Sequence, residues 1–247
     1  MPTYEADAIV LRRLDYGEAD RILTLLTREH GKLSAIAKGA RKGKARTGAL
    51  DLFTRSHMML AKGRNLDVVA QVERRGDVRH ISGNLQRTAC ACLVAEVADK
   101  VLEDRHPVSD LFDLVVVTLD RFNGMSRSPR ADTAWFLMRV LELLGYQPQL
   151  LDCPSCGQPL PEAAGWFSPL LGGVLCQKCG AHDQAGSPVS INSLKVLRLM
   201  SAGDGEVYDR LRLSEALLGE VEAALEGQLE YHLDRHLKSL DFLRSTR

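Results

Sequence analysis

Four of the six cysteines in this 247-residue chain form two pairs, and two residues separate the cysteines within each pair. The pattern is C-x2-C-x19-C-x2-C, made by Cys153, Cys156, Cys176 and Cys179. Such a pair directs both sulfurs to one ion from a single turn, and tetrahedral zinc takes two such turns. Gly157 and Gly180 follow the pairs directly and permit tight turns. We therefore predict one zinc ion bound by the four thiolates.

Four protein ligands leave a tetrahedral ion no open position for water or substrate, so the predicted zinc is structural rather than catalytic. The alternative for a C-x2-C pair is a redox dithiol, which the second pair and the lack of a thioredoxin-like pattern disfavour. His182 is a weaker candidate ligand beside four well-spaced thiols. Cys90 and Cys92 fit the apolar face of a helix, and we predict no chemistry for them.

Residues 30–50, called the basic segment below, contain six lysines and arginines and no acidic residue. A phosphate loop is excluded because only three residues separate Gly39 from Gly43 and no serine or threonine follows Lys44. We predict instead that the segment contacts the phosphates of single- or double-stranded DNA without reading its sequence. The predicted contacts are Lys38, Arg41, Lys42, Lys44 and Arg46. The alternative is a solvated charged loop.

Few aromatic side chains of the first eighty residues are available to stack on unpaired bases: Tyr4, Tyr16 and Phe53. Contacts with phosphates are therefore expected to dominate. With four or five such contacts, the logarithm of the affinity for a single strand should fall with log salt at a slope of about −3.

The formal net charge of zero hides an uneven distribution along the chain. Residues 1–82 carry 16 basic and 10 acidic side chains, residues 83–152 carry 7 and 10, and residues 153–247 carry 9 and 12. A basic N-terminal region and an acidic remainder would leave one side of the protein for DNA and the other for protein partners.

Five runs rich in apolar residues, with glycines near their ends, predict β-strands in the first eighty residues. They cover residues 7–15, 21–27, 32–38, 55–62 and 65–74. Five strands in this length favour an OB-fold barrel, with an SH3-like barrel as the alternative.

From Ser82 onward the apolar period becomes helical. Three helices are predicted before the cysteines: one containing Cys90 to Val101, one beginning near Pro107, and one capped by Asp132. Behind the cysteines, the pattern predicts a short helix at 194–200 and a long one along a leucine stripe from 218 to 240. The predicted fold class is thus α+β and multidomain: a five-stranded OB-fold barrel, then a mainly helical domain with an inserted zinc module.

The chain contains no HExxH, no GxSxG and no complete GxGxxG, and we do not expect an enzyme. The acidic residues of 216–234 follow the polar side of a predicted helix, which favours a solvated face over a two-metal nuclease centre. No segment approaches the roughly 18 consecutive apolar residues of a membrane span, and the N-terminus lacks the pattern of a secretory signal. We expect a cytoplasmic protein without membrane contact.

Taken together, these elements resemble the RecO family of bacterial DNA repair and recombination mediators. Three segments carry the resemblance most specifically: AIVLRRLDYGEADRILTLLTREHGKLSAIAKGARKGKAR at 8–46, LLGYQPQLLDCPSCG at 143–157, and LEYHLDRHLKSLDFL at 229–243. The resemblance covers nearly the whole chain and implies an OB-fold, a helical domain and, as in many members, a zinc module. The expected domains are an OB-fold at 1–81, helical parts at 82–150 and 185–247, and a zinc-ribbon-like insertion at 151–184.

The resemblance also implies a function. The protein would bind single- and double-stranded DNA, anneal complementary strands and, with RecR, help load RecA onto DNA coated by single-strand binding protein. This activity belongs to the RecF pathway and implies a protein associated with the nucleoid. The DNA-binding role transfers only to the five basic residues named above, which match the family's basic segment. The alternatives are a zinc-ribbon adaptor that binds proteins without binding DNA and, third, a divalent-metal nuclease.

Overall fold

The protein is described from a computed structural model that covers residues 2–42, 48–124 and 128–246. Its internal contacts divide the chain into two units. The first unit joins Met1–Pro129 to Leu237–Arg247, and the second unit consists of Arg130–His236. The domain boundaries expected at residues 81, 150 and 184 stay predictions.

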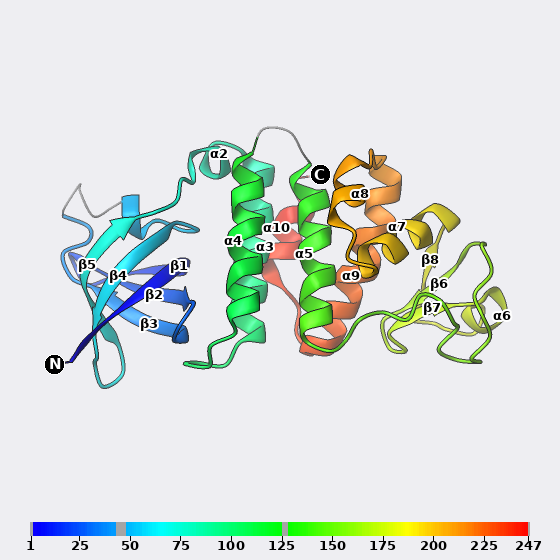
Figure 1. The fold of residues 1–247 in the computed structure, drawn as a ribbon, viewed down its shortest axis with the longest axis horizontal. Coiled ribbons are helices and arrows are strands. Elements are labelled where there is room, and N and C mark those ends of the chain that lie inside the picture. The colour runs from blue at the N-terminus through cyan, green and yellow to red at the C-terminus, as the bar shows by residue number, and fades with distance from the viewer. Residues whose placement is uncertain (1, 43–47, 125–127, 247) are drawn as a thin grey trace. The chain divides into compact units, whose positions relative to one another are not determined.

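The first unit begins with a closed barrel of five strands in the order β1-β2-β3-β5-β4 (Figure 1). The strands are β1 (Thr3–Tyr16), β2 (Asp20–Thr27), β3 (Gly31–Ala37), β4 (Arg55–Ala61) and β5 (Asp67–Arg74). Neighbouring strands are antiparallel except β3 and β5, which are parallel. This is the OB-fold, so the predicted barrel is confirmed.

Alternate residues of each strand fill the barrel interior, because successive side chains of a strand point to opposite faces. The buried interior includes Val10, Leu23, Leu25, Leu33, Ala35, Met58, Leu60 and Val69. Strand β1 shifts its register between Val10 and Arg12. Such a bulge bends a strand and re-aims the side chains that follow it.

Asp67, at the start of β5, is a buried carboxylate that ties the barrel to the chain beyond α3. It accepts hydrogen bonds from the Tyr4 hydroxyl, from the Gly63 N–H at 2.9 Å and from Arg105 at 3.0 Å. Burial opposes ionisation, but these donors outweigh it and lower the pKa of Asp67. Burial, together with the bond to Asp67, raises the pKa of Tyr4 to about 12.

The remaining elements of the first unit are helical: η1 (Gly48–Leu50), α2 (Arg79–Ser82), α3 (Leu85–Val101), α4 (Ser109–Asn123) and α10 (Lys238–Arg244). Asn84 begins α3 by accepting a hydrogen bond from the Arg87 N–H. Helix α10 packs against α3, and Glu96 of α3 accepts hydrogen bonds from the N–H groups of Lys238 and Ser239 at 3.3 and 2.7 Å. The last helix is therefore part of the first unit.

The second unit combines helices with a small three-stranded sheet in the order β7-β6-β8 (Figure 1). Its helices are α5 (Pro129–Leu143), α6 (Gln177–Gly180), α7 (Ile191–Ser201), α8 (Gly205–Arg210) and α9 (Glu215–Leu233). Its strands are β6 (Gly165–Ser168), β7 (Gly173–Leu175) and β8 (Ser187–Val189). Within the described ranges, no helix has the length and apolar character needed to cross a membrane.

Two predicted helix boundaries are wrong. Asp132 does not cap its helix, because α5 already begins at Pro129 and Asp132 lies buried in the first turn. The leucine stripe from 218 to 240 is not one helix: α9 ends at Leu233, and Asp234 adopts a left-handed conformation with φ of 48°. The Asp234 N–H bonds back to the Tyr231 carbonyl at 3.3 Å and the Arg235 N–H to the Glu230 carbonyl at 3.4 Å, which closes the helix end.

Candidate metal centre and nucleic-acid interface

The four cysteines come together at one point of the second unit. Cys153 and Cys156 lie in a turn before β6, closed by a 2.8 Å hydrogen bond from the Gly157 N–H to the Cys153 carbonyl. Cys176 follows β7 and Cys179 lies in α6, and the Gly180 N–H bonds to the Cys176 carbonyl at 2.8 Å. The two turns are therefore built alike. Strands β6 and β7, paired as an antiparallel hairpin, join them.

The geometry of the sulfurs fits a tetrahedral metal ion. All four Sγ atoms lie within 4.8 Å of one another, and those of Cys156 and Cys176 are 4.0 Å apart. Around one zinc ion with Zn–S bonds of about 2.3 Å, tetrahedral sulfurs are about 3.8 Å apart. The cluster could therefore hold a metal ion with little movement. His182 is not part of this cluster among the described residues.

The backbone favours ionised sulfur at Cys153. Burial opposes ionisation of this thiol, but N–H groups of Cys176, Cys156 and Ser155 outweigh it and lower the pKa of Cys153 to about 6. The Ser155 hydroxyl favours ionisation of Cys179, but the neighbouring Cys176 and Cys156 sulfurs raise its pKa. Thiols that share one site titrate as a group, because an ionised sulfur makes ionisation of its neighbours less favourable.

The glycines that follow the pairs serve different needs. Gly157 has φ of +71°, a left-handed conformation that side chains rarely adopt. Gly180 is required for space, since a Cβ atom there would lie 2.2 Å from a ring carbon of Trp166. Trp166, on β6, thus packs flush against the second turn. The sequence indicated both glycines, but the contact with Trp166 becomes visible only in the fold.

Residues 38–42 of the basic segment follow β3 and are fastened to the β1–β2 turn. The Gly39 N–H donates to Asp20 at 2.8 Å, and the Arg41 N–H donates to the Ala19 carbonyl at 2.9 Å. Lys38 and Lys42 are exposed there and form no ion pair with any residue that the structure describes. Lys44 and Arg46 lie outside the described residues. The structure therefore brings Lys38, Arg41 and Lys42 together beside the β1–β2 turn.

Arg41 differs from the two lysines because its guanidinium is already engaged. It donates to the Gly17 carbonyl at 2.9 Å and lies 3.5 Å from the Asp15 carboxylate. Asp15 also pairs with Arg21 at 3.2 Å. Arg41 thus helps fasten residues 38–42 to the barrel, while the side chains of Lys38 and Lys42 stay exposed. The sequence showed the charge of Arg41 but not its partners, which the β1–β2 hairpin supplies.

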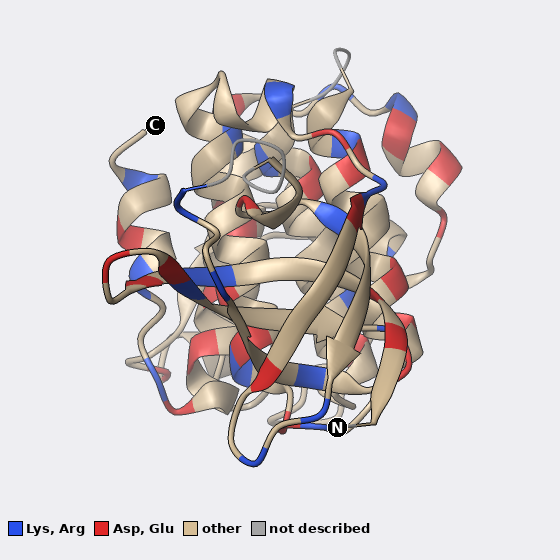
Figure 2. Ribbon diagram, turned by 90° about the vertical axis from the view of Figure 1, so that its left-hand side faces the viewer, with Lys and Arg blue, Asp and Glu red and all other residues tan. Residues whose placement is uncertain are grey.

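Acidic residues are interspersed among the basic ones along the barrel, as the red and blue parts of the ribbon show in Figure 2. Arg13 pairs with Asp51 at 2.5 Å, and Arg12 lies 3.4 Å from Asp99. The surplus of positive charge therefore comes from cations without such partners, of which Lys38 and Lys42 are two.

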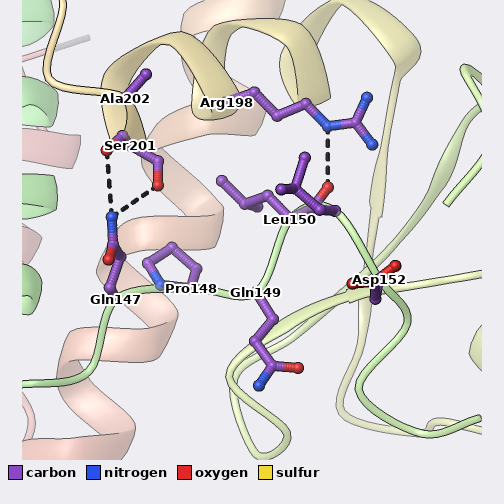
Figure 3. A pocket seen from close by; sticks show the side chains of 9 residues that line it. Gln147, Pro148, Gln149, Leu150, Asp152, Arg198, Ser201 and Ala202 are labelled. Carbon is purple, nitrogen blue, oxygen red and sulfur yellow. Dashed lines mark hydrogen bonds between the residues drawn. The ribbon is translucent and has the colours of Figure 1, made fainter. Parts of the chain in front are cut away.

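A pocket of about 610 Å³ lies in the second unit between the segment 147–152 and the end of α7 (Figure 3). Gln147 donates to the Ser201 carbonyl and hydroxyl at 3.2 and 2.9 Å, and Arg198 donates to the Leu150 carbonyl at 2.9 Å. These polar groups bind one another and fasten the chain before Cys153 to α7. The residues that line the pocket include no cysteine or histidine, so they offer no cysteine–histidine or serine–histidine pair for catalysis.

An OB-fold barrel followed by a helical region with a four-cysteine cluster defines an α+β protein whose barrel has a fold that commonly binds oligonucleotides. The family model described as "Recombination protein O N terminal" matches residues 1–76, and "Recombination protein O C terminal" matches residues 82–241. The chain belongs to the RecO family, whose curated members are DNA repair proteins.

Individual relatives align in sequence with this chain over most of their length. The DNA repair protein RecO of Roseiflexus sp. (strain RS-1) is 37% identical over 245 residues, which cover 99% of this chain and 86% of the relative. RecO of Desulfitobacterium hafniense (strain Y51) is 37% identical over 243 residues, which cover 97% of this chain and 88% of the relative. RecO of Symbiobacterium thermophilum is 33% identical over 250 residues, which cover 100% of this chain and 99% of the relative.

Proposed function

We propose that this protein is a DNA-binding recombination mediator. It binds single- and double-stranded DNA, anneals complementary strands and, with RecR, helps load RecA onto DNA coated by single-strand binding protein in RecF-pathway repair. The observation that carries the proposal is a barrel of the OB-fold with Lys38 and Lys42 exposed beside its β1–β2 turn. Membership of a DNA repair family supports the same conclusion.

The proposed mechanism is neutralisation of charge. Complementary strands repel each other through their phosphates, and a strand held on cationic side chains has lost part of that repulsion. Lys38 and Lys42 supply such charge, Arg41 orients the segment that carries them, and Lys44 and Arg46 of the same segment add to it. No covalent bond is made or broken, so the protein acts as a mediator rather than an enzyme.

Filter binding of the full chain to a labelled single strand at several salt concentrations tests this proposal. The variant Lys38→Ala/Lys42→Ala should bind single strands and duplexes more weakly and should show a salt slope smaller by about 1.4 for single strands, from roughly 0.7 per contact. The matched control is Arg210→Ala/Arg212→Ala, which removes the same charge from α8 and the residues after it. An unchanged affinity and slope in the lysine variant refute the assignment.

The same assays separate the other functions. A zinc-ribbon adaptor that binds only proteins predicts little affinity and little salt slope for the unaltered chain. A nuclease predicts shortened DNA after magnesium is added. Annealing is measured by mixing complementary labelled strands, and binding to RecR and to single-strand binding protein by co-purification with the full chain. Because DNA is its proposed partner, we expect the protein in the cytoplasm, associated with the nucleoid.

We propose further that the four-cysteine cluster holds one structural zinc ion. Four thiolates complete a tetrahedral shell, so the ion would join the two cysteine turns and leave no position for substrate. Metal analysis of freshly purified, reduced protein should find one zinc per chain. Cys156→Ser should lower that content, whereas Cys92→Ser, a change of a helical cysteine outside the cluster, should not. Absence of zinc from the unaltered protein refutes the site.

A further inference from the structure

The outward face of strands β1, β2 and β3 carries a row of apolar side chains. Residues that pair directly across antiparallel strands point to the same face. Leu14 pairs with Ile22, and Ile22 pairs with Ile36. Their neighbours Leu23 and Ala35 are buried in the barrel interior, so the row faces outward. Leu14 is 63% exposed, and the two isoleucines are partly exposed.

The part of this face that adjoins α3 is covered, whereas the part with the apolar row is open. Ile9 and Leu26, a pair on the outward face, are both buried. Lys32, which pairs with Leu26, donates to the Asp99 carbonyl of α3 at 2.6 Å. Packing within the first unit therefore explains the apolar residues near α3 but not those nearer the β1–β2 turn.

Tyr16 stands at the open end of this row. It is two residues beyond Leu14 on the same strand and therefore points to the same face, and it is 55% exposed. The other aromatic residues considered for stacking are already used: Phe53 is buried, and Tyr4 bonds to Asp67 and packs edge-on against His30. Of these three residues, Tyr16 is the one with an exposed ring.

Cations flank the row on both sides. Arg12, which is exposed although it lies 3.4 Å from Asp99, precedes Leu14 on the outward face of β1, and Lys38 follows Ile36 by two residues just after β3. Two of the nearby acidic groups are held by other partners: Asp20 accepts the Gly39 N–H at 2.8 Å, and Asp15 pairs with Arg21 and Arg41. An apolar row with a terminal aromatic ring and flanking cations matches the chemistry of unpaired bases joined by phosphates.

We propose that this row, Leu14, Ile22, Ile36 and Tyr16, is the base-binding surface for single-stranded DNA, with one base stacked on the Tyr16 ring. The proposal rests on the proposed DNA-binding function and deepens it, because it assigns a preference for single strands. Phosphate contacts hold single strands and duplexes alike, but the bases of a duplex are paired and stacked within the helix and cannot cover the row. The row therefore adds affinity for single strands alone.

Tyr16→Ala in the full chain tests the proposal. It should weaken single-strand binding roughly fivefold to tenfold, the lower end of the range for loss of one stacked base, and should leave duplex binding unchanged. The salt slope should stay the same because no charge is removed. Tyr16→Phe keeps the ring and should bind like the unaltered protein. A strand containing 2-aminopurine should lose fluorescence on binding to the unaltered and Tyr16→Phe proteins and lose less with Tyr16→Ala.

The matched control is Tyr231→Ala, which removes an exposed ring from α9 next to Glu230 and should change nothing. Single-strand affinity unchanged in Tyr16→Ala overturns the proposal, and this is also the result expected if the row binds a protein partner. An equal loss for single strands and duplexes overturns it as well. The Lys38→Ala/Lys42→Ala variant separates a failure of the base-binding surface from a failure of the proposed DNA-binding function. If this variant lowers the affinity for single strands and the salt slope while Tyr16→Ala does not change the affinity, DNA binding by the basic segment stands and the base-binding surface is refuted.

Discussion

Replacing Glu222 by leucine should destabilise the second unit far more than replacing Glu222 and Arg130 together. These side chains form an ion pair between α9 and the first turn of α5, where Arg130 is 6% exposed and Glu222 is 3% exposed. Arg130 Nε and Nη2 donate to the two carboxylate oxygens at 2.9 and 2.6 Å. The other carboxylate that contacts Arg130 belongs to Glu215, which is 84% exposed.

The size of the effect follows from this burial. Glu222→Leu leaves a buried guanidinium facing an apolar side chain, a change that costs about 3–5 kcal/mol. Arg130 does not escape by losing its proton, because a guanidinium stays protonated in proteins even without a carboxylate partner. Arg130→Met/Glu222→Leu removes both charges at similar volume and should stay within about 1–2 kcal/mol of the unaltered protein. The double-mutant cycle should therefore show coupling of roughly 3 kcal/mol or more.

Intrinsic fluorescence during urea unfolding is a suitable assay, because both tryptophans of the chain, Trp135 and Trp166, belong to the second unit. With a slope of roughly 1–3 kcal/mol per molar urea, the single variant should lower the unfolding midpoint by about 1 M or more. Two results would refute the reasoning: a single variant as stable as the unaltered protein, or a double variant whose loss equals the sum of the two single losses.

Three further predictions concern pH, the barrel and the cysteine turns. The hydrogen bond to Asp7 raises the pKa of His57. The protonated imidazole therefore stabilises the fold fully below about pH 6.5, and this stabilisation is lost as the pH rises through the raised pKa. Histidine NMR should show this, and Asp7→Asn should lower that pKa. Asp67→Asn should cost about 1–3 kcal/mol in thermal unfolding followed by circular dichroism, since three donors lose a charged acceptor. Gly180→Ala should weaken metal retention against a chelator, because its Cβ would lie 2.2 Å from an indole carbon, whereas Gly219→Ala has no atom within 4 Å and should not.

The barrel and the cysteine cluster could be predicted from the sequence because both depend on local patterns. The strands show alternating apolar residues between glycines, and β4 and β5 run close to their predicted limits. Each cysteine turn is four residues long, so its spacing alone directs two sulfurs to one point. The pairing of two such turns then needed only the short β6–β7 hairpin between them.

What could not be predicted depends on contacts between distant residues or on one backbone angle. Arg41 counted as a free cation because its partners Asp15 and Gly17 lie more than twenty positions earlier. The end of α9 went unnoticed because the leucine period continues through Asp234, whose left-handed conformation leaves no mark in an apolar pattern. The sequence did not predict a stacking role for Tyr16, because a count of aromatic residues does not show which of them are exposed.

The discontinuous first unit has a consequence for how the protein is made. Glu96 of α3 meets the backbone of Ser239 in α10 across 143 positions of sequence. At a synthesis rate of about 5–20 residues per second, α3 leaves the ribosome on the order of ten seconds before its partner helix does. During that interval the barrel strands are complete and free to close, while the side of α3 that α10 will cover faces solvent. The nascent chain can therefore form its barrel first, and it completes the first unit last, when α10 packs against α3.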